Sequence, residues 1–282
     1  MSRPKVQIVI PVYNSAKYLR RCLDSLIEQT YPFWEAVLVD DASNDNSVEI
    51  IKEYQAKDER IVFYGFEKNQ GVSNVRNFAL EKLSEKYTAF LDSDDFWEKD
   101  MLEVMVGKAE EEDADVVQSR FFYDYAGGKR VLPKGAFKKD TKIGKKQINK
   151  IYYKMATGIN MNHVCMKLIR TELIKDIRFD TTLRTAEDLQ FCVKLFCNVK
   201  SYYFINRAFY HYCRNEESLT GKGLGGKEKL KANRKVSVTM GDAIKQLGID
   251  TPLLKFLCGF RPYTIILSKI FRMIKEKLFS KE

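Results

Sequence analysis

The sequence predicts an α/β fold, in which a mostly parallel β-sheet is flanked by helices and followed by a C-terminal helical extension. Short β-branched runs alternate with segments of helical period through the first 120 residues, a pattern typical of strand–helix–strand units. Two of these runs end in acidic residues, as strands do when their carboxyl ends open on a site. The 282 residues are 45% hydrophobic, which is enough for a sizeable core without disulfides.

The first half of the chain alternates regularly. Four short runs rich in β-branched or aromatic residues predict strands, at residues 5–12, 36–39, 61–64 and 87–91. Apolar residues at helical spacing predict three helices between them. The first begins after Asn14 or Ser15, the second after Asn44 or Asp45, and the third covers residues 73–83.

The second half is less regular. A helix is expected at 100–111 and a strand at 114–118. A hairpin then follows, with Gly127-Gly128 between residues 121–123 and 131–132.

Five further segments complete the expected chain. The basic residues 138–154 are expected to form a mobile loop or a solvated helix, and residues 162–174 a strand followed by a helix. A helix begins near residue 187, a strand covers 201–209, and a long helix covers about 227–247.

Acidic residues follow two of the expected strands. Asp40 and Asp41 end one strand, and Asp92, Asp94 and Asp95 end another. Carboxylates this close repel one another unless a cation lies among them, and hard oxygen ligands favour magnesium or manganese. The alternative is an acidic turn that caps the following helix.

Glu187 and Asp188 form a second acidic pair, at the start of a helix whose buried face carries Leu189, Val193 and Phe196. The helix dipole stabilises carboxylates at this end. The alternative is an ordinary acidic helix start.

Charge and cysteine content narrow the class of protein. The formal net charge of +10 suggests an anionic partner, either nucleic acid, anionic lipid or a phosphorylated substrate. The six cysteines form no Cys-x-x-Cys pair and keep apart from the two histidines, so we expect reduced thiols and no zinc. No segment looks long enough for a signal peptide or a spanning helix, and we therefore expect a cytoplasmic protein.

The last segment has an apolar stripe opposite a charged face. The stripe consists of Tyr263, Ile266, Leu267, Ile270, Phe271, Ile274 and Leu278. A basic amphipathic helix of this kind can lie in a membrane interface, at the inner face of the cell membrane. The alternative is a helix packed on the protein's own core.

Taken in order along the chain, these motifs resemble those of the family 2 glycosyltransferases, bacterial inverting enzymes with the GT-A fold. The resemblance covers roughly residues 5–220. It rests on five stretches in the right order: Val9 to Asn14, Leu38 to Ser43 with Asp45 and Ser47, Asn69 to Ser73 with Arg76-Asn77, Asp92 to Asp95, and Glu187-Asp188.

The resemblance implies a domain organisation and an activity. Residues 1–220 would form the catalytic domain, with a nucleotide-sugar-binding half (1–120) and an acceptor-binding half (121–220), and residues 221–282 a helical extension. The enzyme would move a hexose or N-acetylhexosamine from a UDP-sugar to a hydroxyl of a glycan or lipid-linked glycan, in cell-surface polysaccharide or teichoic acid synthesis. It would use Mn²⁺ or Mg²⁺ and bind no nucleic acid. Peripheral membrane contact would run through residues 253–282.

The resemblance also assigns roles on the nucleotide side. Pro11 and Tyr13 would pack against the nucleoside, and Asp41 would recognise the uracil. Asn69 and Arg76 would lie near the nucleotide.

Further roles concern the diphosphate and the metal. Asp92 and Ser93 would contact the donor, and Asp94 would hold the metal ion. Arg214 and Ser218 would close over the diphosphate. His211 is a candidate for a further metal ligand.

The catalytic roles fall on the second acidic pair. Asp188 would be the general base that takes the proton of the acceptor hydroxyl. Glu187 would orient the acceptor or tune its neighbour.

Two other readings compete with this one. A sugar-1-phosphate nucleotidyltransferase would show a Gly-rich basic loop after the first strand, where this chain has residues 11–17, Pro-Val-Tyr-Asn-Ser-Ala-Lys. A basic, non-catalytic binding module would use residues 138–154 and the last helix, but acids at strand ends suit a polyanion binder poorly.

Overall fold

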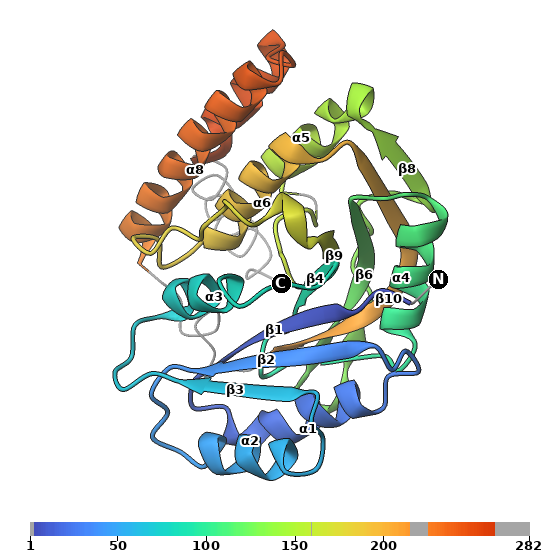
Figure 1. The fold of residues 1–282 in the computed structure, drawn as a ribbon. Helices are drawn as coiled ribbons and strands as arrows, with labels where there is room; N and C mark the ends of the chain where they lie inside the picture. The colour runs from blue at the N-terminus through green and yellow to red at the C-terminus, as the bar shows by residue number, and fades with distance from the viewer. Residues whose placement is uncertain (1–2, 159, 215–224, 263–282) are drawn as a thin grey trace, which may run out of the picture.

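The computed structural model describes residues 3–158, 160–214 and 225–262 (Figure 1). Ser218 and the apolar stripe expected at residues 263–278 lie outside these ranges. Within the described part, no helix combines the length and the apolar character needed to cross a membrane. All six cysteines are free thiols.

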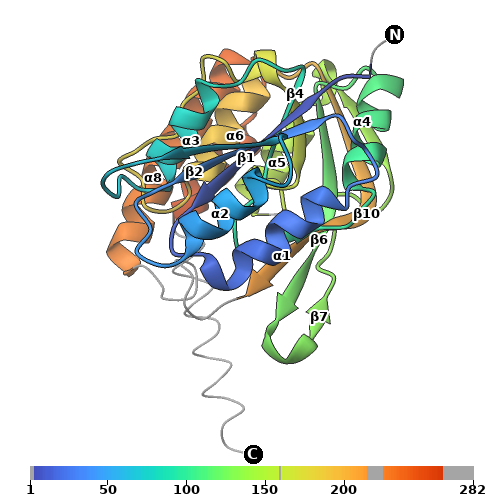
Figure 2. The same cartoon turned by 60° about the horizontal axis from the view of Figure 1, so that its bottom comes forward.

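The first half of the sheet is parallel, as expected. Its strands, in the spatial order β3-β2-β1-β4, are β1 (Val6–Val12), β2 (Trp34–Asp40), β3 (Ile61–Gly65) and β4 (Tyr87–Phe90). The intervening helices are α1 (Ala16–Ile27), α2 (Ser47–Gln55) and α3 (Val72–Leu80). α1 and α2 cover one face of these strands and α3 the other (Figures 1 and 2).

The second half of the sheet is mixed, so the sheet as a whole is less parallel than expected. Its strands are β5 (Phe96–Trp97), β6 (Val116–Tyr125), β7 (Arg130–Val131), β8 (Thr141–Gly144), β9 (Lys167–Arg170) and β10 (Ser201–Arg214). β9 lies between β4 and β6 and is antiparallel to both, whereas β6 and β10 are parallel. β4, β6 and β10 therefore run the same way, and their carboxyl ends share one edge of the sheet.

The helices of the second half are α4 (Met101–Glu111), α5 (Asn149–Ala156), α6 (Glu187–Asn198) and α8 (Gly226–Gln246). Short 3-10 turns are η1 (Ala126–Gly128), η2 (Lys145–Gln147) and η3 (Thr171–Leu173). α6 and α8 lie side by side on the same side of the sheet as α3 (Figures 1 and 2). The Lys235 ammonium forms an ion pair with Asp180 at 2.5 Å, which joins α8 to the segment before α6.

The segment of residues 138–154 forms a strand and a helix with a buried face, and the expectation of a mobile loop or a solvated helix was wrong. Its first part is β8, which pairs with the start of β10. Its second part is α5, on which Ile151, Tyr152 and Met155 are buried. The apolar residues lie between lysines that stay at the surface, and the high lysine content obscured their helical spacing.

Two other expectations were partly right. The hairpin after Gly127-Gly128 exists, with Tyr123 opposite Val131, but its first arm belongs to the single long strand β6. The strand expected within 162–174 is β9, and it is followed by the single turn η3 where a helix was expected.

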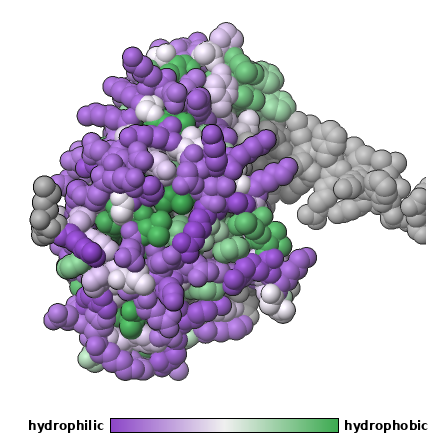
Figure 3. All heavy atoms as spheres, turned by 90° about the vertical axis from the view of Figure 1, so that its right-hand side faces the viewer, coloured by the Kyte–Doolittle hydropathy of each residue, from purple (hydrophilic) through white to green (hydrophobic). Residues whose placement is uncertain are grey.

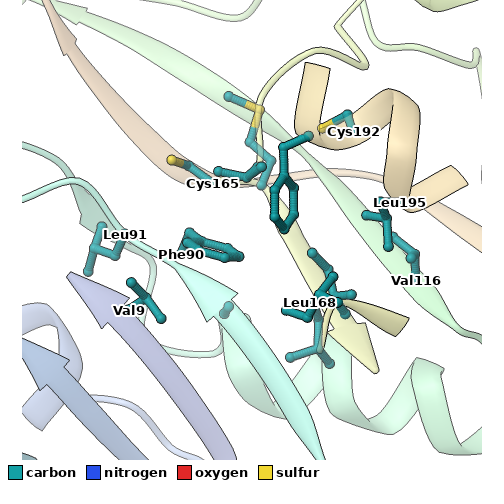
Figure 4. Packing of buried hydrophobic residues seen from close by; sticks show 14 of the residues in the cluster. Val9, Phe90, Leu91, Val116, Cys165, Leu168, Cys192 and Leu195 are labelled. Carbon is teal, nitrogen blue, oxygen red and sulfur yellow. The ribbon is translucent and has the colours of Figure 1, made fainter. Parts of the chain in front are cut away.

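Figure 4 shows how the two halves share one apolar core. Phe90 of β4, Leu168 of β9, Val116 of β6 and Leu195 of α6 converge there, and each is at most 1% exposed. Helices on both faces explain why β1 and β2 are almost continuously apolar.

Candidate active site

The loop after β4 carries three carboxylates, of which one is buried and two are partly exposed. Asp95 is 1% exposed, and its oxygens accept hydrogen bonds from the Tyr210 hydroxyl (2.6 Å) and the Cys213 backbone N–H (2.7 Å). Burial, with the nearby charges of Asp94 and Asp92, raises the pKa of Asp95 well above its usual range. Asp92 and Asp94 remain partly exposed. The loop therefore has one buried anchor on β10 and two carboxylates at the carboxyl edge of the sheet.

The same loop is also held from the first helix. The Ser93 hydroxyl is buried and lies 2.7 Å from the Ser15 hydroxyl. Arg21 of α1 donates to the Asp94 carbonyl at 2.8 Å and to the Cys213 sulfur at 3.0 Å. The position of the acidic loop is thus set by both α1 and β10.

Arg76 joins the acidic loop to the second acidic pair. This α3 residue is 4% exposed, and its guanidinium donates to Asp188 Oδ1 (2.8 Å) and Asp92 Oδ1 (2.9 Å). Glu187 lies 3.6 Å away. Burial alone would lower the pKa of Arg76, but the charges of Asp188 and Asp92 outweigh burial and raise it. The expected nearness of Arg76 to the nucleotide stays a prediction, whereas the structure shows that Arg76 bridges the two acidic groups.

Glu187 and Asp188 begin α6, directly after Ala186, whose positive φ of 62° turns the chain into the helix. Asp188 Oδ2 also accepts the Val164 backbone N–H at 3.3 Å. Burial and the charge of Asp188 raise the pKa of Glu187 to about 7, against the opposing effect of Arg76. Glu187 therefore titrates near neutral pH beside Asp188, whose carboxylate is oriented by hydrogen bonds from Arg76 and Val164.

The loop before β9 completes this cluster, and the sequence analysis missed it. The Cys165 thiol, 4% exposed, donates to Asp92 Oδ2 at 3.3 Å. Burial raises the pKa of Cys165 well above its usual range, which keeps the thiol protonated as a donor. Val164 and Cys165 thus reach Asp188 and Asp92 from one short loop.

A buried lysine holds that loop. Lys167 is 0% exposed, and its ammonium donates to the carbonyls of Met161 (3.2 Å) and His163. Burial lowers its pKa, and none of the described carboxylates forms an ion pair with it. Its position within the apolar run Met166 to Ile169 was the one sequence signal that could have indicated a role.

The residues expected on the nucleoside side lie together. Tyr13 is 47% exposed just after β1, and Asp41 is 3% exposed just after β2. Asn69 donates to the Asp41 carbonyl at 3.3 Å. The Asp41 carboxylate accepts the backbone N–H groups of Gln70 (2.7 Å) and Gly71 (2.8 Å), so it also fixes the turn before α3. Recognition of uracil by Asp41 stays a prediction, as do the nucleoside contacts of Tyr13 and of Pro11, which is half-buried in β1.

Side chains of the β2–α2 loop bind the backbone of the β1–α1 loop. Ser43 accepts the Asn14 N–H at 2.9 Å, and Ser47 accepts the Ser15 N–H at 2.9 Å. Asp45 accepts the N–H of Ala16 at 2.9 Å, the first residue of α1, and that of Ser47 at 3.0 Å. The motif residues Asp45 and Ser47 therefore connect the starts of α1 and α2.

Of the two residues expected to close over the diphosphate, the structure describes only Arg214, the last residue of β10. Arg214 is exposed, and its guanidinium lies 4.6 Å from the centre of the Tyr123 ring. Ser218 lies outside the described residues. Closure of Arg214 and Ser218 over a diphosphate stays a prediction.

His211 is packed inside the protein. It is 1% exposed, with Nδ1 2.6 Å from Asp124 and Nε2 3.0 Å from Glu98. Its ring stacks on Phe96 at 4.1 Å. Because carboxylates occupy both ring nitrogens, the structure gives no support to His211 as a metal ligand.

The acidic loop still offers what a hard divalent cation binds. Asp94 brings a partly exposed carboxylate to the rim. Asp92 beside it is also partly exposed, but its oxygens already accept from Arg76 and Cys165, and Asp95 is buried with both oxygens bonded. Among the described residues no group of three or more His, Cys, Asp or Glu side chains is arranged to hold a metal. Mg²⁺ commonly takes one or two protein carboxylates and completes its shell with phosphate oxygens and water, which this donor set fits.

Comparisons with known proteins agree with this geometry. A family model described as glycosyl transferase family 2 matches residues 7–178. The chain is 32% identical over 227 residues to the glycosyltransferase GlyA of Streptococcus pneumoniae, which covers 77% of this chain and 31% of GlyA. It is 30% identical over 207 residues to the poly(ribitol-phosphate) beta-N-acetylglucosaminyltransferase TarP of Staphylococcus aureus, covering 70% of this chain and 59% of TarP. The chain thus spans about a third of GlyA and less than two thirds of TarP.

A solved structure shows the same architecture. The crystal structure of S. aureus TarS 1-349 matches with a TM-score of 0.74 at 25% identity, covering 92% of this chain and 72% of that one. The complex of TarS 1-349 with UDP-GlcNAc matches with a TM-score of 0.72 at 26% identity, covering 86% and 70%.

Proposed function

The chain belongs to glycosyltransferase family 2 and has the GT-A fold, and from this premise we propose that it is an inverting glycosyltransferase. It would transfer a hexose or N-acetylhexosamine from a UDP-sugar to a hydroxyl of a glycan acceptor, in cell-surface polysaccharide or teichoic acid synthesis. The observation that carries the proposal is the buried bridge Asp92–Arg76–Asp188, because it fixes a donor-side acid and a candidate base in one cluster.

On the donor side, we assign the nucleoside to the surface formed by Pro11, Tyr13, Asp41 and Asn69. An acidic oxygen can accept the N3–H of uracil, which favours UDP as the carrier. The similarity to TarS bound to UDP-GlcNAc supports the same class of donor. Arg214 would contact the diphosphate, together with Ser218.

Asp94, with Asp92 beside it, would hold Mn²⁺ or Mg²⁺ at the diphosphate. When bound, such an ion neutralises the negative charge that develops on the departing UDP. Arg76 would remain in place as the cation that orients Asp92.

Asp188 would act as the general base. The acceptor oxygen attacks the anomeric carbon on the face opposite UDP, the bond from that carbon to the diphosphate oxygen breaks, and Asp188 takes the hydroxyl proton. Arg76 and the Val164 N–H hold the Asp188 carboxylate for this step. Glu187, whose pKa of about 7 leaves it partly protonated at neutral pH, would orient the acceptor or tune its neighbour Asp188.

We assign the catalytic domain to residues 1–220, with the acceptor contacts in 121–220, and a helical extension to 221–282. In that extension, residues 252–262 are helical and expose Leu253 (58%), Phe256 (62%) and Phe260 (36%). This exposed apolar face beside the exposed Lys255 supports peripheral contact with the inner face of the membrane.

UDP release tests the proposed function. A panel of UDP-sugars is incubated with the full chain and manganese, or with a chelator, and free UDP is measured. We expect slow metal-dependent hydrolysis of one sugar, lost in Asp94→Ala. Asp188→Asn should reduce transfer by about 10²-fold or more once an acceptor is present. Absence of both binding and turnover of every UDP-sugar, with either metal, would contradict the proposal.

A further inference from the structure

The net charge of this protein is concentrated in one segment. Residues 126–158 contain nine lysines, one arginine and a single acid, Asp140, so they contribute +9 to the formal charge of +10. The other 249 residues are almost neutral, with 38 basic and 37 acidic side chains. We call residues 126–158 the basic segment.

Most of these cations have no acidic partner within residues 3–158, 160–214 and 225–262. Seven lysines are exposed and form no ion pair with a carboxylate of the described residues: Lys129, Lys134, Lys138, Lys139, Lys145, Lys146 and Lys150. By contrast, Arg130 pairs with Asp124 at 2.7 Å and Lys142 with Glu112 at 3.2 Å. Uncompensated surface charge of one sign attracts anions over distances of about 10 Å.

The backbone that carries these lysines is fixed to the sheet. β8 pairs with the start of β10, and Arg120 donates to the Pro133 carbonyl at 2.7 Å. Asn206 of β10 donates through its N–H to Asp140 (2.8 Å) and through its side chain to the Lys138 carbonyl (2.9 Å). Figure 3 looks onto the side that carries β8 and α4, and hydrophilic side chains cover most of it. The lysines therefore form an ordered surface.

The basic segment begins at the edge of the sheet that carries the acidic loop. β6 ends at this edge, so the hairpin between β6 and β7 projects beyond it (Figure 2). Asn160 donates to the Lys134 carbonyl, and its own carbonyl accepts from Gln118 at 2.7 Å. Four residues further on, Val164 donates to Asp188. The Lys134 end of the basic segment thus adjoins the loop that reaches the proposed base, and the segment then runs back along β10 to β8 at its amino-terminal end.

We propose that the basic segment binds the acceptor, and that this acceptor carries negative charge repeated along its chain, as phosphodiester or carboxylate groups. The inference rests on the proposed function. Lysines suit such a ligand because each ammonium is a point charge that needs no fixed geometry of its partner. A lipid surface would also attract lysines, but the connection through Asn160 and Val164 to Asp188 favours the molecule that receives the sugar.

Binding of defined polymers tests the inference. Labelled poly(glycerol phosphate), polygalacturonate and neutral dextran of similar length are titrated with the full chain, and the affinity is measured by fluorescence anisotropy at several salt concentrations. We expect binding of an anionic polymer, but not of dextran, with an affinity that falls steeply as salt rises. Whichever anionic polymer binds identifies the charged group.

Matched charge reversals locate the binding surface. The variant Lys134→Glu, Lys138→Glu, Lys139→Glu should weaken binding at least tenfold and flatten the salt dependence. A control on α8, Lys227→Glu, Lys231→Glu, Arg234→Glu, changes the net charge equally at exposed positions and should stay within about twofold of the wild type. Should the glutamate variant lose its circular dichroism signal, the variant Lys134→Gln, Lys138→Gln, Lys139→Gln serves instead, with a smaller expected loss of affinity.

Three results would overturn the inference. They are no binding of either anionic polymer by the wild type, equal losses in the two charge-reversal variants, and binding of phosphatidylglycerol vesicles but of neither polymer. Donor hydrolysis by the wild type is measured in parallel. If UDP is released but no polyanion binds, the inference alone fails. If no UDP-sugar is bound or turned over, the proposed function fails and the inference with it.

Discussion

Replacing Arg76 by methionine should destabilise the protein, and more strongly at pH 8 than at pH 5.5. The change removes two hydrogen bonds to carboxylates, of 2.8 Å to Asp188 and 2.9 Å to Asp92, from a site where the arginine is 4% exposed. Breaking one buried ion pair costs about 3–5 kcal/mol. The Asp92 side chain is 30% exposed, so water solvates this carboxylate in the variant and offsets part of the stability lost with Arg76. We therefore expect a decrease of about 3 kcal/mol in the free energy of unfolding at neutral pH.

The pH dependence follows from Glu187. Its pKa is about 7 in the folded protein, above the ordinary value of 4.5, so the folded state loses stability as pH rises through this interval. Arg76 lowers this pKa, and without it the pKa of Glu187 rises further. The interval then extends above pH 7, and the variant loses more stability than the wild type between pH 7 and pH 8.

Urea unfolding at pH 5.5 and pH 8 measures both effects, with tryptophan fluorescence as the signal. Trp34 and Trp97 are 0% and 3% exposed, so both report on unfolding. The double variant Arg76→Met, Glu187→Gln should not show the additional loss of unfolding free energy at pH 8. Arg20→Met, which breaks the exposed pair with Glu53, is the control and should have little effect. A loss below about 1 kcal/mol, or the same loss at both pH values, would refute the reasoning.

Other parts of the structure can be tested in the same way. Tyr210→Phe removes the 2.6 Å donor to buried Asp95 and should cost about 1–3 kcal/mol of unfolding free energy, and an unchanged urea midpoint would count against the anchor. Lys167→Met should lower the rate of UDP release at saturating UDP-sugar about tenfold, with little change in the KM for the UDP-sugar. The reason is that its loop positions the Val164 N–H and the Cys165 thiol, which donate hydrogen bonds to Asp188 and Asp92. An unchanged rate would limit Lys167 to a structural role. Leu253→Ser with Phe256→Ser should reduce flotation with anionic vesicles several-fold, and equal flotation of variant and wild type would refute membrane contact through this helix.

The acidic residues of the candidate site were predictable from local patterns. Asp92 and Asp94 follow a short apolar strand, and Glu187 and Asp188 begin an amphipathic helix, so each pair could be placed at an element's end. The parallel order of β1 to β4 then followed from the regular alternation of strands and helices.

The contacts that assemble the site could not be predicted in this way. Arg76 bonds Asp188 across 112 positions of the sequence, and Cys165 reaches Asp92 across 73. The Cys165 contact depends on β9, a four-residue strand that begins two residues after Cys165 and inserts between β4 and β6. So short a strand has no periodicity to recognise, and its antiparallel placement is a property of the assembled sheet.

The hydrogen bonds between the β1–α1 and β2–α2 loops have a consequence for protein engineering. Asn14, Ser15 and Ala16 each depend on a side chain of the other loop, namely Ser43, Ser47 and Asp45. The two loops should therefore be exchanged together when this chain is recombined with a relative. A chimera that takes only residues 43–47 from a relative replaces the side-chain acceptors of these bonds, whereas exchanging residues 13–16 and 43–47 together transfers donors and acceptors as one unit. Libraries meant to alter nucleotide preference should accordingly vary the two loops as a block.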